Sequence, residues 1–396
     1  MSNAAESRKQ QLLRDRSHHA VVPPEELLFD LVYVFAITQL SHLLLEHLTG
    51  HGALEALVLW LAVWLGWQYT TWFTNWFNPE HPIVRVALFG VMLLSLMCAV
   101  ALPEAFSDYG LLFAICFVTM ELGRTLWTLV NLEADNPLRA NFQRIACWLV
   151  VSAAFWIAGG FADPDMRLVL WGLAVAVQYV APMTGFVVPG LGRSTTKDWT
   201  IDGAHLAERC QLFVIVALGE TIVATGATAA RAEHVEPASI IAFILSFLGT
   251  LTLWWVYFGT SSKDGTAVIT KSDDPGRIGA LFHYTHAVLV GAIIVCAVGN
   301  DLVIAHPDGH VGLKEVAVLY GGPAIYLIGN ALFKRVVYRA WPVSHLVGLA
   351  LLALTAPLAH FSDLLVSGGW TTLVTLVVAI WDYKQRQRNP MQVAHH

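Results

Sequence analysis

The chain has 396 residues, of which 56% are hydrophobic and only 13% are charged, and its formal net charge is −6. Soluble domains carry about 25% charged residues, and the mean hydropathy here is +0.58. This composition excludes an ordinary soluble domain, and the lack of a basic patch with interleaved aromatic residues argues against nucleic acid as a partner. We predict an all-α, polytopic integral membrane protein.

The N-terminal residues and the cysteines give two further expectations. Arg8, Lys9, Arg14 and Arg16 are not followed by an apolar run with a cleavage site, which favours a short, retained, solvated tail over a secretory signal. The five cysteines fall inside apolar runs without Cys-x-x-Cys spacing. We therefore expect small core residues, not a disulfide framework or a zinc site.

Twelve apolar runs are long enough to cross a hydrocarbon layer of ~30 Å. Proline, glycine, asparagine and aspartate separate them, as in Asn78-Pro79 and Asp274-Pro275-Gly276. The sequence therefore predicts twelve transmembrane helices. They begin near Leu28, Ala53, Ile83, Tyr109, Ala140, Met166, His205, Pro237, Arg277, Leu313, Trp341 and Ser367.

The distribution of lysine and arginine predicts the orientation of these spans. With the N-terminus inside, only Arg167, Arg231 and Lys314 fall in outside segments, and Arg124 falls within a span. All other lysines and arginines fall in inside segments. Since cytoplasmic loops carry an excess of basic residues, we expect both termini to face the cytoplasm.

The two halves of the sequence have similar residues at equivalent positions. Arg85 before span three matches Arg277 before span nine, and Arg139 at span five matches Arg339 at span eleven. Because six is an even number, two six-helix repeats would be parallel, related by an axis along the membrane normal. The predicted organisation is a cytoplasmic N-terminal tail (1–27), a first repeat (28–189), a cytoplasmic linker (190–204), a second repeat (205–384) and a cytoplasmic C-terminal tail (385–396).

Span seven carries four ionisable residues on one face: His205, Glu208, Arg209 and Glu220. The first three lie in the first cytoplasmic turn and are candidates for a cytoplasmic gate or for simple helix capping. Glu220 lies deep in the span, where an acid costs about 2.5–3.5 kcal/mol to insert. It must therefore face the bundle interior, as a substrate- or ion-binding group or as a buried structural hydrogen-bonding group.

Span one has a second polar stripe, formed by Gln39, His42 and Glu46, and Gln39 aligns with Glu220 in the proposed repeat. These residues are further candidates for binding a substrate or ion. Asp30 lies on the opposite side of span one, so we expect it to make a different contact or to mark the helix start. It is kept among the candidates.

Span four places Glu121 and Arg124 three residues apart, close enough for an ion pair within one helix. A structural pair is the favoured interpretation, and both residues remain binding candidates. His283 and His286 have no assured acidic partner, so we predict no metal site. No P-loop or catalytic nucleophile motif occurs, and we predict no catalytic residues and no cofactor.

Three segments closely resemble the bacterial low temperature requirement A family: PEELLFDLVYVFAITQLSHLL (24–44), TNWFNPEHPIVR (74–85) and GLGRSTTKDWTIDGAHLAERCQLFVIVALGETI (190–222). The resemblance covers nearly the whole chain. It implies a multi-pass protein of the bacterial inner membrane that is linked by name to growth in the cold. Phe29-Asp30 is more weakly similar to the Phe-Ser-Asp signature of six-helix potassium channels, but here the serine is missing.

Three function classes remain open. A transporter that moves an unidentified small solute or ion through a polar site between the two repeats is the favoured hypothesis. A membrane-embedded enzyme acting on a lipid or isoprenoid substrate would use the same carboxylates for acid and base chemistry. An ion channel, or a structural and sensory membrane protein, is the third. The expected partners are the lipid bilayer and the solute or ion, with a homodimer left open and no nucleic acid.

Overall fold

The computed structural model describes residues 9–15, 21–230 and 236–388. Within them, 12 helical segments are long and apolar enough to cross a membrane, which confirms the predicted number of spans. The first six are α2 (Pro24–Glu46), α3 (Gly50–Trp76), α4 (Pro82–Ala101), α5 (Gly110–Asn131), α6 (Leu138–Phe161) and α7 (Pro164–Met183). The others are built from η1 (Thr196–Asp198, outside the spans), α8 (Gly203–Ala230), α9 (Pro237–Phe258), α10 (Ser262–Thr270), α11 (Pro275–Ala305), α12 (Leu313–Leu319), α13 (Gly321–Tyr338), α14 (Val343–Thr355), η2 (Ala356–Phe361) and α15 (Leu364–Arg388).

The chain folds into two compact units. Of the described residues, unit 1 contains those up to Leu43, Gly50–Arg209 and Asp274–Arg277. Unit 2 contains Leu44–Thr49, Cys210–Asp273 and the residues from Ile278 onward. The first two turns of α8 and the first residues of α11 therefore belong to unit 1. A parallel repeat relationship between the halves stays a prediction.

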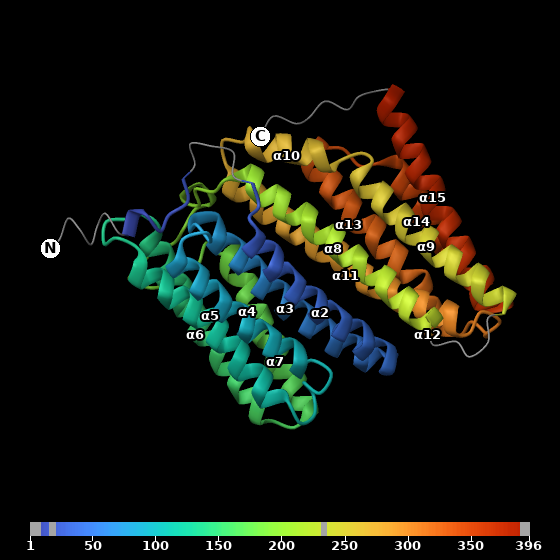
Figure 1. Ribbon diagram of the computed structural model, residues 1–396, viewed down its shortest axis with the longest axis horizontal. Coiled ribbons are helices and arrows are strands. Elements are labelled where there is room, and N and C mark those ends of the chain that lie inside the picture. Colours follow the sequence, from blue (N-terminus) through green and yellow to red (C-terminus); the bar gives the residue numbers. More distant parts are fainter. Residues whose placement is uncertain (1–8, 16–20, 231–235, 389–396) are drawn as a thin grey trace. The chain divides into compact units, whose positions relative to one another are not determined.

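Unit 1 is a bundle of helices that follow one another in sequence. α4, α5, α6 and α7 pack pairwise in chain order, and α3 packs against α5 and α7 (Figure 1). Its core is aromatic: Trp156 and Trp171 are fully buried, with ring centroids 5.2 Å apart. Gly159 permits this packing, because a Cβ there would lie 2.5 Å from the Trp171 ring.

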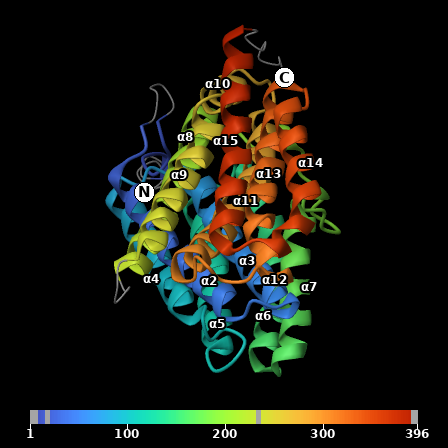
Figure 2. The ribbon, with the colours of Figure 1, turned by 90° about the vertical axis from the view of Figure 1, so that its right-hand side faces the viewer.

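Unit 2 departs from simple uninterrupted spans. α9 packs against α15, and α13, α14 and α15 follow one another (Figure 2). Span eight breaks between α9 and α10, span ten breaks between α12 and α13, and span eleven ends as the 3₁₀ segment η2. The break in span ten coincides with Gly321-Gly322-Pro323, where proline has no backbone N–H to donate.

The segment before α2 is held to the end of α3 by backbone hydrogen bonds. Leu12 is 1% exposed, and its carbonyl oxygen accepts from the Asn78 N–H at 2.9 Å. The Arg14 N–H donates to the carbonyl oxygen of Trp76 at 2.8 Å. Leu12 therefore departs from the expected solvated tail, whereas Gln10, Gln11 and Asp15 are exposed as expected.

Candidate functional site

Five charged or titratable side chains gather inside unit 1, and we name them the charge cluster. They come from the N-terminal segment, the first two turns of α2 and the first two turns of α8. None of the five side chains is more than 8% exposed. The members are Arg14, Glu26, Asp30, His205 and Arg209.

Both carboxylates of the charge cluster are ion-paired. Glu26 accepts from Arg14 Nη2 at 2.9 Å and from His205 Nε2 at 2.7 Å, and its Oε2 lies 3.1 Å from Arg209 Nη1. Asp30 Oδ1 accepts from Arg209 Nη2 at 2.6 Å and from the indole N–H of Trp67 at 2.8 Å. Two guanidinium groups therefore face two carboxylates, and their charges balance.

Asn75, near the end of α3, orients the imidazole ring of His205. Its Nδ2 donates to the Asp202 carbonyl at 2.9 Å, and its Oδ1 accepts from the Asp202 N–H at 2.8 Å, which sets the orientation of the amide. The same Nδ2 lies 3.1 Å from His205 Nδ1, which must then be an acceptor. His205 Nε2 then carries the hydrogen that it donates to Glu26 at 2.7 Å.

This arrangement is suited to anchoring helices. Both carboxylates lie against guanidinium groups, and removing one partner of a buried ion pair is costly because it leaves an uncompensated charge. Burial lowers the pKa of Arg14, and the Glu26 carboxylate opposes that shift, so the guanidinium keeps its charge. The charge cluster therefore joins the N-terminal segment, α2 and α8 on one side of unit 1.

The structure separates the predicted gate residues. His205 and Arg209 join the cluster, whereas Glu208 is half-buried and lies outside it. Asp30 makes the different contact that was expected of it. Sequence reasoning missed Glu26 and Arg14, because an acid in a first helical turn and a basic residue before a span both have ordinary explanations.

The other predicted residues occupy unlike environments. On α2, Gln39 is half-buried, and His42 and Glu46 are exposed. Glu220 in α8 is 2% exposed, which confirms that this acid does not face lipid. A shared site of these residues stays a prediction.

The expected ion pair on span four is present. Arg124 Nη2 lies 2.8 Å from Glu121 Oε1, and Arg124 Nη1 donates to Thr70 Oγ1 at 2.7 Å. Because Thr70 belongs to α3, the pair also ties α5 to α3. Its geometry is that of a structural contact within unit 1.

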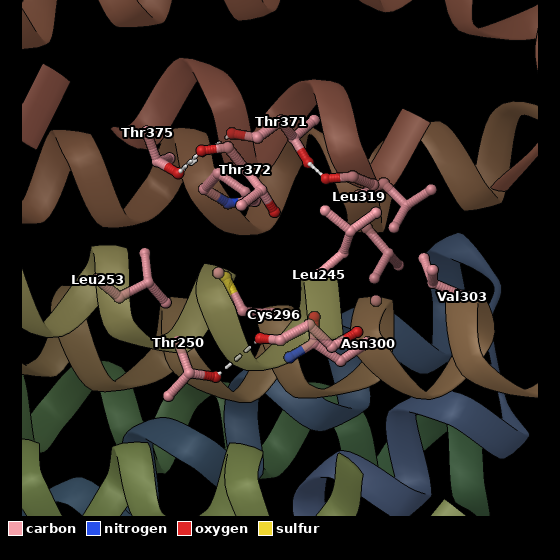
Figure 3. Close-up of a pocket in the computed structure, with 16 residues that line it drawn as sticks. Leu245, Thr250, Leu253, Cys296, Asn300, Val303, Leu319, Thr371, Thr372 and Thr375 are labelled. Carbon is pink, nitrogen blue, oxygen red and sulfur yellow. Dashed lines mark hydrogen bonds between the residues drawn. The ribbon is translucent and has the colours of Figure 1, made fainter. Parts of the chain in front are cut away.

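Unit 2 contains a cavity of about 50 Å³, which we name the threonine cavity. Side chains from α9, α11 and α15 face one another across it (Figure 3). Val318, Leu319 and Pro323, which flank the break between α12 and α13, complete the wall. Its polar lining consists of Ser246, Thr250, Asn300, Thr371, Thr372 and Thr375.

The polar lining is uncharged. Thr250 Oγ1 donates within its own helix to the Ser246 carbonyl at 3.2 Å, and Thr371 Oγ1 to the Gly368 carbonyl at 3.1 Å. A hydroxyl that donates in this way keeps lone pairs that can accept a hydrogen bond or contact a cation. One water needs about 10–15 Å³ of such space, so the cavity has room for a few waters or one solute of a few heavy atoms.

Sequence reasoning missed the threonine cavity because it searched for ionisable residues. The relevant signal is several serines and threonines on different apolar spans, and it becomes specific only when packing brings those spans together. Within the described residues, no group of three or more His, Cys, Asp or Glu side chains is arranged to hold a metal ion.

The model of the bacterial low temperature requirement A protein (LtrA) family matches residues 21–380. The chain belongs to this family. A relative from Rhizobium meliloti (strain 1021), "Uncharacterized protein RA0937", is 38% identical over 383 residues, which cover 96% of this chain and 93% of the relative. No solved structure matches the chain.

Proposed function

We propose that this LtrA family protein moves a small polar solute or a monovalent ion across the bacterial inner membrane, and that the threonine cavity is its binding site. The observation that carries the proposal is a hydroxyl-lined cavity beside a broken membrane-spanning helix. In this proposal both termini are cytoplasmic.

Broken helices are informative in a membrane. Backbone groups cannot be left without partners in hydrocarbon, so irregular backbone at membrane depth is found where it is buried in protein or lines an aqueous cavity. In many transporters the substrate site lies at such breaks, where half-helix ends and backbone carbonyls contact the ligand. Leu319 and Pro323 lie on the two sides of the break in span ten and both line the cavity.

The lining limits the substrate class. No carboxylate, guanidinium, ammonium or imidazole group is among the residues that line the cavity. A multiply charged solute would lose its hydration without a compensating charge, which is prohibitively costly in a medium of low dielectric constant. The cavity therefore favours an uncharged polar solute or an ion of single charge, coordinated by oxygen.

The enzyme hypothesis has less support. Acid and base chemistry needs a carboxylate or histidine at the ligand, whereas the carboxylates of the charge cluster are both ion-paired and the threonine cavity has none. A channel would share the cavity with a transporter. Saturation of the flux at high solute concentration distinguishes the transporter from the channel.

The predicted site residues enter the proposal as parts of a pathway. We place Gln39, His42 and Glu46 on its first half and Glu220 on its second half, and we retain the two parallel six-helix repeats as the framework. The charge cluster would hold the cytoplasmic ends of α2 and α8. None of these residues is needed for the argument from the threonine cavity.

The experiment is a flux measurement in proteoliposomes of the full chain. Urea, glycerol, methylammonium and rubidium are offered in turn, and uptake is compared with that of protein-free vesicles. We expect at least one probe to cross faster through the wild type. Thr371→Val keeps the side-chain shape but removes a cavity hydroxyl worth about 0.5–1.5 kcal/mol, so uptake should fall about 3- to 10-fold.

The matched control is Thr270→Val. Thr270 is exposed on α10, and its hydroxyl makes the same kind of bond, to the Thr266 carbonyl at 2.7 Å. Uptake should be unchanged in this variant. Equal loss in both variants, or no uptake of any probe above protein-free vesicles, would count against the proposal.

A further inference from the structure

A chain of five buried polar side chains runs through unit 2 outside the threonine cavity. Two lie on α13, two at the start of α14 and one near the end of α15, and none is more than 3% exposed. Two of them are oppositely charged and one is a histidine, all within membrane-spanning segments. The members are Asn330, Lys334, Ser344, His345 and Asp382.

The contacts form a continuous path. Lys334 Nζ donates to Asp382 Oδ2. Ser344 Oγ lies 3.3 Å from Asp382 Oδ1 and 3.1 Å from His345 Nδ1. His345 Nε2 lies 2.8 Å from Asn330 Oδ1, and Asn330 Nδ2 has no hydrogen-bond partner among the described residues.

When His345 is neutral, the path has one hydrogen too few for its contacts. Asn330 Oδ1 only accepts, so His345 Nε2 must carry a hydrogen, and Nδ1 then carries none. The single hydroxyl hydrogen of Ser344 cannot serve both His345 Nδ1 and Asp382 Oδ1. One additional proton on Nδ1 completes the path, because Nδ1 donates to Ser344 and Ser344 donates to Asp382.

A neutral His345 fits a second arrangement. If the Asn330 amide turns over, its Nδ2 donates to His345 Nε2, and the only imidazole hydrogen lies on Nδ1, again donated to Ser344. Adding a proton to Nε2 and turning the amide back restores the observed contacts. The side chains therefore have two hydrogen-bonded states that differ by one proton and one amide orientation.

We propose that His345 is a proton-binding site, with Asp382 as its counter-charge through Ser344 and the Asn330 amide as the element that changes with its protonation. Resting on the proposed function, the site couples proton binding in unit 2 to the uptake of solute. The proton enters and leaves as H⁺ from water, and no other bond is made or broken.

The neighbouring charged groups are already engaged. Asp382 favours an added proton on His345 and Lys334 opposes it. Asp264 accepts from Arg386 Nη2 at 2.9 Å and from the Tyr338 hydroxyl at 2.6 Å. Asp264 is therefore already paired with these two groups.

His286 is a matched control. It is also buried, but its Nδ1 lies 2.6 Å from the Phe282 carbonyl and its Nε2 lies 2.6 Å from the Tyr257 hydroxyl. A neutral imidazole with its hydrogen on Nδ1 satisfies both contacts, because the Tyr257 hydroxyl donates to Nε2. His286 therefore lacks no hydrogen and should not take up a proton over the same pH range.

The test is ¹⁵N NMR of the full chain with labelled histidine, recorded as a function of pH. His345→Gln should remove one titrating imidazole from the wild-type spectrum, and His286→Gln should leave all titrating signals in place. If His345→Gln titrates with the same set of signals as the wild type, the proposal is overturned.

Ser344→Ala is the second variant, in case His345→Gln does not fold. It keeps the imidazole but cuts its link to Asp382, a hydrogen bond to a charged group, so His345 should bind its proton about ten-fold more weakly. An unchanged titration would overturn the proposal.

The coupling is measured in proteoliposomes with an entrapped pH dye and the same four probes. A proton gradient should accelerate uptake by the wild type, and His345→Gln should lose that acceleration but keep uptake. If the uptake rate of the wild type does not depend on the proton gradient, the proposed coupling is overturned, but the proton-binding site is not. A titrating His345 without uptake of any probe supports the proton site and contradicts the proposed function.

Discussion

At the scale of residues, the charged side chains of the charge cluster lie against groups of opposite charge. In the charge cluster, Arg209 serves both Glu26 and Asp30 with separate nitrogens. The Asn75 amide contacts His205 Nδ1, so that the ring presents Nε2 to Glu26. This balance explains how the first turns of α2 and α8 tolerate groups that lipid excludes.

Removing one member of the charge cluster should therefore lower the free energy of unfolding. We expect Arg209→Met to lower the free energy of unfolding by about 3–5 kcal/mol, because it leaves two buried carboxylates with too few cations. The control is Arg85→Ala, which breaks a 2.7 Å pair with Glu25 in which Arg85 is 38% exposed. Exposed pairs contribute about 0–1 kcal/mol. Equal losses in thermal unfolding of the two variants would contradict the anchoring role.

Glu220 gives a second prediction at this scale. Glu220→Gln keeps the shape and most of the hydrogen bonds of the buried acid, so stability should be nearly unchanged and flux should be lost if the charge acts in transport. Glu220→Leu removes the polar group and should cost about 1–3 kcal/mol. Wild-type flux in Glu220→Gln would mean that this residue is only a structural hydrogen-bonding group.

Some of these buried polar residues could be predicted from the sequence, and others could not. Burial of Glu220 and pairing of Glu121 with Arg124 followed from the cost of an isolated charge in lipid and from helical spacing. Glu26 could not be found in that way, because its partners Arg14 and His205 are distant in the sequence. Asn330 and Ser344 are uncharged, and only packing of α13 against α14 and α15 gives them a role.

At the scale of elements, length and hydropathy predicted the twelve spans, but not the breaks within them. A break leaves the mean hydropathy of a span unchanged, and a single proline is also compatible with a kink. In span ten, Gly322 allows close packing as well, because its Cα faces Cys296 of α11. The cavity beside the break therefore depends on a contact that no single span reveals.

Two adjacent glycines test that packing. A Cβ on Gly322 would lie 2.9 Å from Cys296 Sγ and 3.1 Å from its backbone nitrogen, whereas a Cβ on Gly321 would have no neighbour within 4 Å. We expect Gly322→Ala to destabilise the protein by about 1–3 kcal/mol through overpacking. Gly321→Ala should be neutral or stabilising by up to about 1 kcal/mol, since alanine favours helix. Thermal unfolding measures both, and the reverse order would show that α13 does not pack closely on α11.

At the scale of the whole molecule, the chain is a twelve-span LtrA family protein whose described residues form two compact units. The distribution of basic residues predicts that both termini face the cytoplasm. Orientation decides from which side a solute reaches the threonine cavity.

Cysteine labelling tests the orientation. Single cysteines at the exposed positions Thr195, Lys271 and Asp308 can be introduced after Cys147, the exposed native thiol, is replaced by serine. Thr195 and Lys271 should react with an impermeant reagent only from the cytoplasm, and Asp308 only from outside. Labelling of Thr195 from outside would reverse the proposed topology.

A native thiol in the wall of the threonine cavity allows a direct test of whether solute passes through it. Cys296 lines the cavity. Proteoliposomes are treated with methyl methanethiosulfonate, a small reagent that adds a methylthio group, and uptake of the permeant probe is followed. The account predicts that wild-type uptake is blocked and that Cys296→Ser is resistant. Wild-type uptake that persists after complete modification of Cys296, or equal inhibition of Cys296→Ser, would contradict it.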